Sequence, residues 1–161
     1  MLEAPIVSKL DRRGILAHSL PKRVLHVVEN LDRGAVENWL VRMLRHARRQ
    51  NVRVDWTFYC TLNQPGEMEQ EARALGARVI HSPVPLTRKV EFVRALRVEL
   101  RRGNYDVLHC HHDLLSAVYL LAAAGLLIGR RIVHVHNADE TVPTGKSAED
   151  NPVIRTHGEK P

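Results

Sequence analysis

The chain has 161 residues, of which 44% are hydrophobic, 26% charged and 4% aromatic. This composition excludes an intrinsically disordered protein, and the length suits one domain that buries about 70% of its unfolded surface. The net charge of +6 raises the question of a nucleic-acid partner, because basic patches bind phosphate backbones. No aromatic stacking platform or known binding motif accompanies that charge, so we expect no nucleic acid.

Strands and helices alternate along the chain from residue 22 onwards. Strands are predicted at 23–28, 52–60, 78–81, 106–110 and 131–135, and helices at 36–49, 67–75, 87–102 and 114–127. This alternation predicts an α/β fold, a Rossmann-like parallel sheet of about five strands flanked by helices, with the strand order 3-2-1-4-5.

Three segments divide the sequence. Residues 1–21 have no steady period and are expected to form an N-terminal extension without the apolar core of a signal peptide. Residues 22–139 form the predicted domain, and residues 140–161 form an irregular or disordered tail. The most apolar stretch, Leu114 to Ile128, is too short for the ~20 residues that cross a bilayer. We expect it to be the most deeply buried helix.

Two further features bear on the compartment. Cys60 and Cys110 each end an apolar run without a CxxC partner, which favours buried reduced thiols and a cytoplasmic location. Six arginines recur at helical spacing on two predicted helices: Arg42, Arg45 and Arg49, then Arg94, Arg97 and Arg101. Such stripes are usually solvated faces, and a peripheral contact with the inner face of a membrane is the alternative.

Polar residues stand where the first, fourth and fifth strands end. The first strand runs into ENLDRG (29–34), the fourth into HCHHD (109–113) and the fifth into HVHN (134–137). Carboxyl ends of parallel strands meet at the ligand-binding edge, so we expect these tips to converge there. His109 and His111 are two residues apart and should share one face of the sheet.

The turn before the first helix ends in Gly34, where backbone N–H groups and the helix dipole favour an anion. The turn lacks both GxGxxG and GxxxxGK[ST], so the dinucleotide fingerprint and the P-loop are absent.

Together these motifs resemble the N-terminal domain of family-4 (GT-B) glycosyltransferases, over roughly Lys22 to Asp139. RGAVE (33–37) is similar to the R-G-G-A-E segment of the family, with Ala35 in place of the second glycine. DVLHCHH (106–112) and IVHVHN (132–137) are similar to its histidine motifs. The E-x7-E donor motif belongs to the C-terminal domain of the family, and we assign it to no residue of this sequence. We therefore expect the C-terminal donor domain to be absent and this acceptor-binding half to be inactive alone.

The resemblance implies retaining transfer of a sugar from a nucleotide-sugar donor to a glycan or lipid-linked acceptor, with no metal and no other cofactor. It implies that His111 is the catalytic residue, near the reacting sugar. The residues implied to bind substrate are Arg33, Gly34, Glu37, His109, His112, His136 and Asn137.

Two alternatives stay open. His109, His111 and Asp113 have the H-x-H-x-D spacing of a metal-dependent hydrolase, which His134 or His136 could complete. A non-catalytic module that binds membrane surfaces through the arginine faces is the other alternative.

Overall fold

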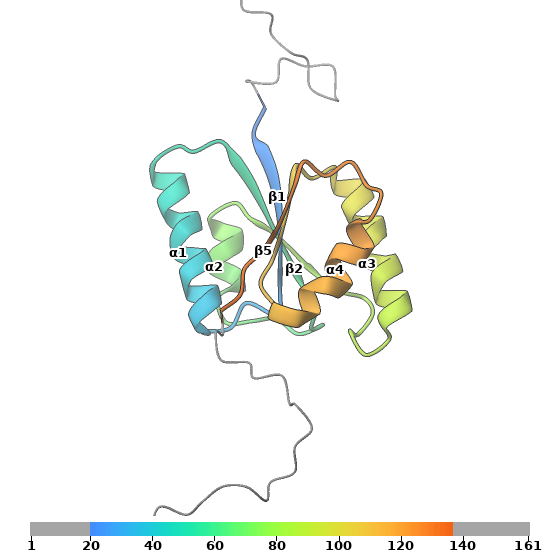
Figure 1. Ribbon diagram of the computed structural model, residues 1–161. Coiled ribbons are helices and arrows are strands. Elements are labelled where there is room, and N and C mark those ends of the chain that lie inside the picture. The colour runs from blue at the N-terminus through green and yellow to red at the C-terminus, as the bar shows by residue number, and fades with distance from the viewer. Residues whose placement is uncertain (1–19, 137–161) are drawn as a thin grey trace, which may run out of the picture.

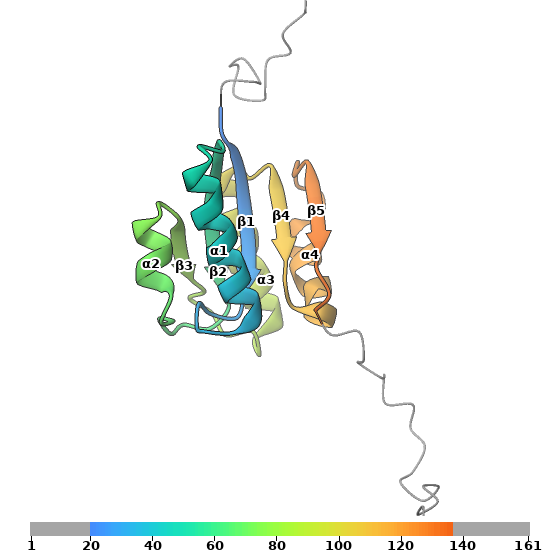
Figure 2. The ribbon, with the colours of Figure 1, turned by 90° about the vertical axis from the view of Figure 1, so that its left-hand side faces the viewer.

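The computed structural model describes residues 20–136 of the chain. Strands β1 (Lys22–Val28), β2 (Val54–Cys60), β3 (Arg78–His81), β4 (Val107–Cys110) and β5 (Arg130–Val133) form one sheet. Every neighbouring pair is parallel, and the order is β3-β2-β1-β4-β5 (Figure 2). The predicted α/β fold and strand order are confirmed. The predicted extension and tail fall almost wholly outside the described residues.

Helices lie on both faces of the sheet (Figure 1). Helices α1 (Ala35–Arg49) and α2 (Glu69–Ala74) cover one face, and α3 (Lys89–Gly103) and α4 (Ser116–Ala123) cover the other. A short 3₁₀ turn, η1 (Asp113–Leu115), precedes α4. Parallel strands require crossover helices of this kind, and each face therefore encloses its own apolar core.

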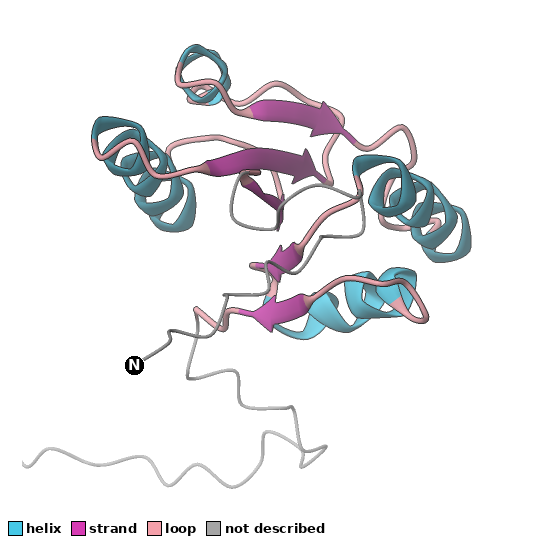
Figure 3. Cartoon of the chain, turned by 90° about the horizontal axis from the view of Figure 1, so that it is seen from above, coloured by secondary structure: helices cyan, strands magenta, loops and turns pink. Residues whose placement is uncertain are grey.

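The α1 face is covered only in part. Helix α1 buries Leu40, Val41 and Leu44 against the strands on its side. Figures 2 and 3 show that no helix of the described residues lies over β4 and β5 on this face. Ile132 of β5 is accordingly 41% exposed. The edge strand β5 is thus accessible from this side.

Helix α4 is shorter and less buried than the sequence predicts. It ends at Ala123, and Gly125 then adopts a positive φ of 69°, which turns the chain back toward β5. Leu114, Leu121 and Leu127 are 77%, 64% and 76% exposed. The expectation of the most deeply buried helix is therefore wrong, because α4 packs on one side only while its sequence is apolar all round. Within residues 20–136, no helix has the length and apolarity needed to cross a membrane.

Candidate active site

Five histidines gather at the carboxyl edge, on the face that α1 partly covers. They are His26, His109, His111, His134 and His136, called the histidine cluster below. The strand register explains the cluster, because His26 pairs with His109 across β1 and β4. Ring centroids are 4.1 Å apart for His109 and His111 and 4.2 Å apart for His134 and His136. The prediction that His109 and His111 are neighbours is confirmed.

Hydrogen bonds connect three of these rings from the core to the surface. His26 Nδ1 lies 3.2 Å from His111 Nε2, and His111 Nδ1 lies 3.4 Å from His136 Nε2. A neutral imidazole donates through one nitrogen and accepts through the other, so the three rings form a chain with one direction of donation. His26 and His111 are 4% and 5% exposed, whereas His136 is exposed. The hydrogen-bonded series of rings therefore ends at His136, whose ring a ligand can reach.

The environment favours the neutral form of four rings of the cluster, those of His26, His109, His111 and His136. Burial, followed by the charge of neighbouring histidines, lowers the pKa of His109 to about 4 and that of His111 to about 3. The pKa of His26 is lowered by the same causes, and burial lowers the pKa of His136. Neutral imidazoles at physiological pH offer both a donor and an acceptor, as hydroxyl recognition requires.

Two tryptophans border the histidine cluster. Trp56 of β2 stacks on His26 with ring centroids 4.5 Å apart. Trp39 of α1 presents its ring edge-on to His134 at 5.2 Å, close to His111 and His136 as well. Both tryptophans also line a mainly apolar groove of about 540 Å³ beside α1, together with Met43. The histidine cluster thus borders one end of a larger surface, and the rest of that surface is mainly apolar.

The turn after β1 forms the other side of this edge. Gly34 is the N-cap of α1 with φ −74° and ψ 168°, a conformation open to any residue. Its hydrogen leaves room for a neighbour, because a Cβ there would lie 2.2 Å from the carboxylate of Glu37. The predicted proximity of Gly34 to the start of a helix is confirmed, and Glu37 folds back over that helix end.

Acidic groups dominate the turn. Burial raises the pKa of Glu37, and the charges of Glu29 and Asp32 add to the effect. Arg33 is exposed and pairs with Glu67 at 2.7 Å. This mixture offers many hydrogen-bond acceptors and little net positive charge, which suits sugar hydroxyls better than a diphosphate.

A second glycine fixes the shape of the turn. A Cβ on Gly66 would lie 2.2 Å from the carbonyl carbon of Leu31 and 2.7 Å from the backbone nitrogen of Asp32. Glu67 N–H donates to Asp32 Oδ1 at 3.1 Å, and Met68 N–H donates to the Leu31 carbonyl at 2.8 Å. The loop after β2 thus holds the turn in place through direct backbone contact.

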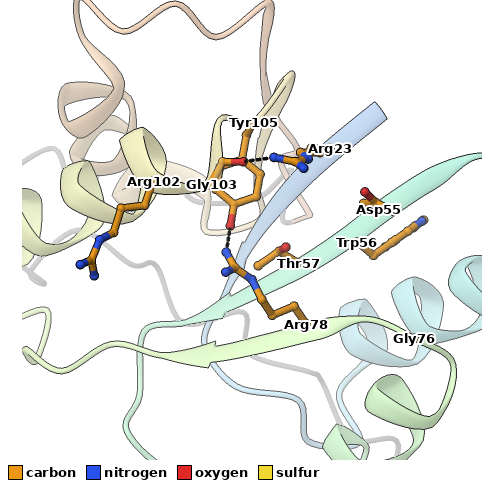
Figure 4. A pocket seen from close by; sticks show the side chains of 9 residues that line it. All are labelled: Arg23, Asp55, Trp56, Thr57, Gly76, Arg78, Arg102, Gly103 and Tyr105. Carbon is orange, nitrogen blue, oxygen red and sulfur yellow. Dashed lines mark hydrogen bonds between the residues drawn. The ribbon is translucent and has the colours of Figure 1, made fainter. Parts of the chain in front are cut away.

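A separate polar cavity of about 350 Å³ lies at the opposite, amino edge of the sheet (Figure 4). Arg23, Arg78 and Tyr105 line it, and their side chains bond to one another or to the end of α3. Arg23 and Arg78 hold α3 to the strands, and the cavity lies away from the carboxyl edge.

Comparison with known proteins identifies the family. The sequence profile of Glycosyltransferase Family 4 matches residues 36–157, which is more than half of the chain. The chain belongs to glycosyltransferase family 4. A Bacillus subtilis (strain 168) protein named as a glycosyltransferase, EpsF, is 30% identical over 122 residues, covering 74% of this chain and 31% of EpsF.

A solved structure supports the same fold. MurG of Acinetobacter baumannii superposes with a TM-score of 0.51 at 13% identity, covering 73% of this chain and 36% of MurG. The fold of this family-4 chain is therefore the Rossmann-like half of a GT-B architecture. The chain spans about a third of the length of both proteins.

Among the predicted site residues of this family-4 chain, His112 stands apart. Its Nδ1 is hydrogen-bonded to the hydroxyl of Tyr119 in α4, so its ring turns away from the histidine cluster. Asn137 lies outside the described residues. Asp113 accepts the backbone N–H of His136 at 2.9 Å and belongs to neither triad of grouped ligands, so the hydrolase alternative loses its third ligand. The comparisons give that alternative no support either.

Sequence reasoning did not include His26 or Trp39 in the site. A signal for His26 exists, because the tripeptide Val-Leu-His occurs both at 24–26 and at 107–109. In adjacent parallel strands in register, equal tripeptides place their histidines side by side. Trp39 has no comparable signal, because its contact with the cluster depends on how α1 crosses the sheet.

Proposed function

We propose that this chain forms the acceptor-side wall of a retaining glycosyltransferase that moves a sugar from a nucleotide-sugar donor to a glycan or lipid-linked acceptor. Family membership supports the reaction class. The observation that carries the proposal is the chain of neutral imidazoles at the carboxyl edge, which runs from buried His26 through His111 to exposed His136. Neutral rings of this kind donate to and accept from hydroxyl groups without holding a fixed charge.

Within this wall, His136 is the ring that meets a sugar hydroxyl. His111 is 5% exposed and has both ring nitrogens within reach of other histidines. We therefore assign His111 a positioning role: it fixes the tautomer and the orientation of His136, as a buried partner does for a reacting imidazole. His109 packs against His111, with ring centroids 4.1 Å apart, and helps to hold the His111 ring in place.

The groove beside α1 accommodates the acceptor. Its apolar lining and the 37% exposed ring of Trp39 offer a surface for the C–H faces of a sugar ring or for the start of a lipid chain. The polar histidine cluster at one end then orients hydroxyl groups. If the acceptor is lipid-linked, a peripheral contact with the membrane would bring this protein to its acceptor.

The turn at Gly34 contributes hydrogen bonds to the hydroxyls of the substrates. Backbone N–H groups at the start of α1, the Glu37 carboxylate and the exposed Arg33 guanidinium all stand at this edge. Because acidic groups outnumber Arg33 here, we propose that the donor diphosphate is held mainly by groups outside residues 20–136.

The arginine faces give limited support to a membrane role. Arg45 pairs with Glu71, and Arg97 donates to the carbonyls of Ala122 and Ala124. Both therefore serve contacts between helices. A cytoplasmic location and a contact with the inner face of the membrane stay predictions, which salt-sensitive binding to anionic vesicles would test.

The proposal is tested by ligand binding to the 161-residue chain. A glycan array and a panel of nucleotide sugars, read out by saturation-transfer NMR, should show binding of glycans and weak binding of nucleotides. Trp39→Ala and His136→Ala should weaken glycan binding by about tenfold, or about 1.4 kcal/mol, because each removes one contact. Val98→Ala is the control, since Val98 is 50% exposed on α3 at the other face. Failure of every glycan to bind, or equal binding by all variants, contradicts the acceptor role.

A further inference from the structure

We propose that His111, His134 and His136 also bind one divalent transition-metal ion of the Zn²⁺ class. Each of the three offers one ring nitrogen, and these nitrogens lie within 4.8 Å of one another. Neutral imidazole is the commonest metal ligand in proteins. Three of them on one ion, with a fourth position left for water or a ligand, is a familiar zinc coordination.

The spacing of the rings supports such coordination. A tetrahedral ion with Zn–N bonds of about 2.0–2.1 Å has ligand nitrogens about 3.3–3.4 Å apart. His111 Nδ1 and His136 Nε2 are already 3.4 Å apart, which is long for a hydrogen bond between nitrogens. The ring of His134 stacks on His136 with centroids 4.2 Å apart. The third nitrogen, on His134, lies within 4.8 Å of the other two.

The backbones that carry the three rings are fixed. His111 N–H donates to the Val27 carbonyl at 3.2 Å, and His134 N–H donates to the Cys110 carbonyl at 2.9 Å. His136 N–H donates to the Asp113 carboxylate at 2.9 Å. Metal binding would therefore cost little backbone ordering, because the ligands stand on anchored strand ends.

His26 is placed to support His111 as a metal ligand. Metal-bound histidines usually donate their other ring N–H to a nearby acceptor, which fixes the tautomer. With His111 Nδ1 on the metal, its Nε2–H faces His26 Nδ1 at 3.2 Å, and His26 is buried. The hydrogen bond between His26 and His111 thus prepares His111 to bind through Nδ1.

The alternative triad of His26, His109 and His111 is less suitable. His26 is 4% exposed, so an ion there has neither a path of entry nor an open position. In the chosen triad His134 is half-buried and His136 exposed, which gives access from solvent. Because no carboxylate takes part, the site favours Zn²⁺, Co²⁺ or Ni²⁺ over Mg²⁺.

Metal binding would take His136 Nε2 away from His111 Nδ1 and so replace the hydrogen bond that we propose to orient the His136 ring for sugar hydroxyls. This consequence, an inhibitory effect of Zn²⁺ on glycan binding, rests on the proposed function, whereas the metal site itself does not. Direct measurement of the bound metal therefore separates a failure of one proposal from a failure of the other.

The test uses the 161-residue chain purified without a histidine tag and stripped of metal by a chelator. Titration with Co²⁺, followed by visible absorption, and with Zn²⁺, followed by calorimetry, should show one ion per chain and no binding of Mg²⁺. His134→Ala should weaken binding by more than about tenfold, the least that even a supporting residue of a metal site contributes. His46→Ala on the exposed side of α1 is the matched control and should bind like the parent chain.

Two outcomes would overturn the proposal. The first is a chain that binds less than one Zn²⁺ at tens of micromolar. The second is a His134→Ala variant that binds Co²⁺ with unchanged affinity and spectrum. His134 is only half-buried, so its removal should leave the fold intact. Circular dichroism and thermal unfolding of the metal-free variants confirm that a loss of metal is not a loss of structure.

Discussion

The histidine cluster should make this chain sensitive to mild acid. The pKa of His109 falls from its ordinary 6.5 to about 4 in the folded protein, and that of His111 to about 3, mainly through burial. A group whose folded pKa is lowered stabilises the fold fully above its unfolded pKa and loses that contribution as the pH falls. The window of loss therefore begins near pH 6.5 and extends down to the folded pKa values.

The magnitude follows from the unfolded chain. At about pH 5, a free imidazole with a pKa near 6.5 is protonated about 30 times more often than not, while His109 and His111 in the folded chain remain neutral. This difference of 1.5 pH units, at about 1.4 kcal/mol per unit, costs about 2 kcal/mol per ring. The two rings together cost about 4 kcal/mol, and His26 adds to that loss because its pKa is lowered as well.

Denaturant unfolding at about pH 8 and about pH 5 measures this effect. A loss of about 4 kcal/mol is a large part of the 5–15 kcal/mol typical of a domain. His111→Asn should reduce the difference in the free energy of unfolding between the two pH values by about 2 kcal/mol, because the variant lacks one of the rings that resist protonation. This holds whether or not the substitution also changes the stability at about pH 8. His46→Ala, at an exposed position outside the histidine cluster, is the control variant. If the parent chain differs by less than about 1 kcal/mol between the two conditions, the rings are not held neutral and the reasoning fails.

Three further predictions concern other parts of the fold. Gly66→Ala should lower the free energy of unfolding by about 1–3 kcal/mol, because the added Cβ would press on the backbone of Leu31. A change within experimental error in denaturant unfolding would refute that contact. Cys60 and Cys110 should react with thiol reagents only on unfolding, because burial raises the pKa of both thiols to about 12; fast labelling under native conditions would contradict this. Leu121→Ala should change stability by less than about 0.5 kcal/mol, since Leu121 is 64% exposed, and a larger loss of thermal stability would mean that something covers α4.

Strand order and the position of the site could be predicted because they depend on period and on chain connectivity. Alternating strands and helices leave few parallel topologies, and histidines at the tips of adjacent strands must then share an edge. His109 and His111 could be placed as neighbours from the two-residue period alone. These inferences use only local sequence, and the structure confirms them.

Other features depend on packing between elements and could not be read from the sequence. His112 follows His111 directly, yet its ring bonds to Tyr119, because β4 ends there and the chain turns into η1. The apolar stretch after Leu114 suggested a buried helix, but burial is set by what lies over a helix and not by its composition. Trp39 joins the site only because α1 packs so that the Trp39 ring meets His111 and His134 at the strand tips.

The two proposals for the carboxyl edge make different demands on the same rings, which allows each to be tested alone. A sugar hydroxyl needs one accessible nitrogen and an apolar surface beside it, whereas a metal ion needs three converging nitrogens and no such surface. Trp39→Ala should therefore weaken glycan binding and leave the affinity for Co²⁺ unchanged, because no atom of Trp39 is a metal ligand. His134→Ala should weaken Co²⁺ binding by more than about tenfold and leave most of the glycan affinity, because His136 remains. If both variants lost both ligands to the same degree while staying folded, one shared distortion of the edge would explain the data, and the separate roles assigned to Trp39 and His134 would be wrong.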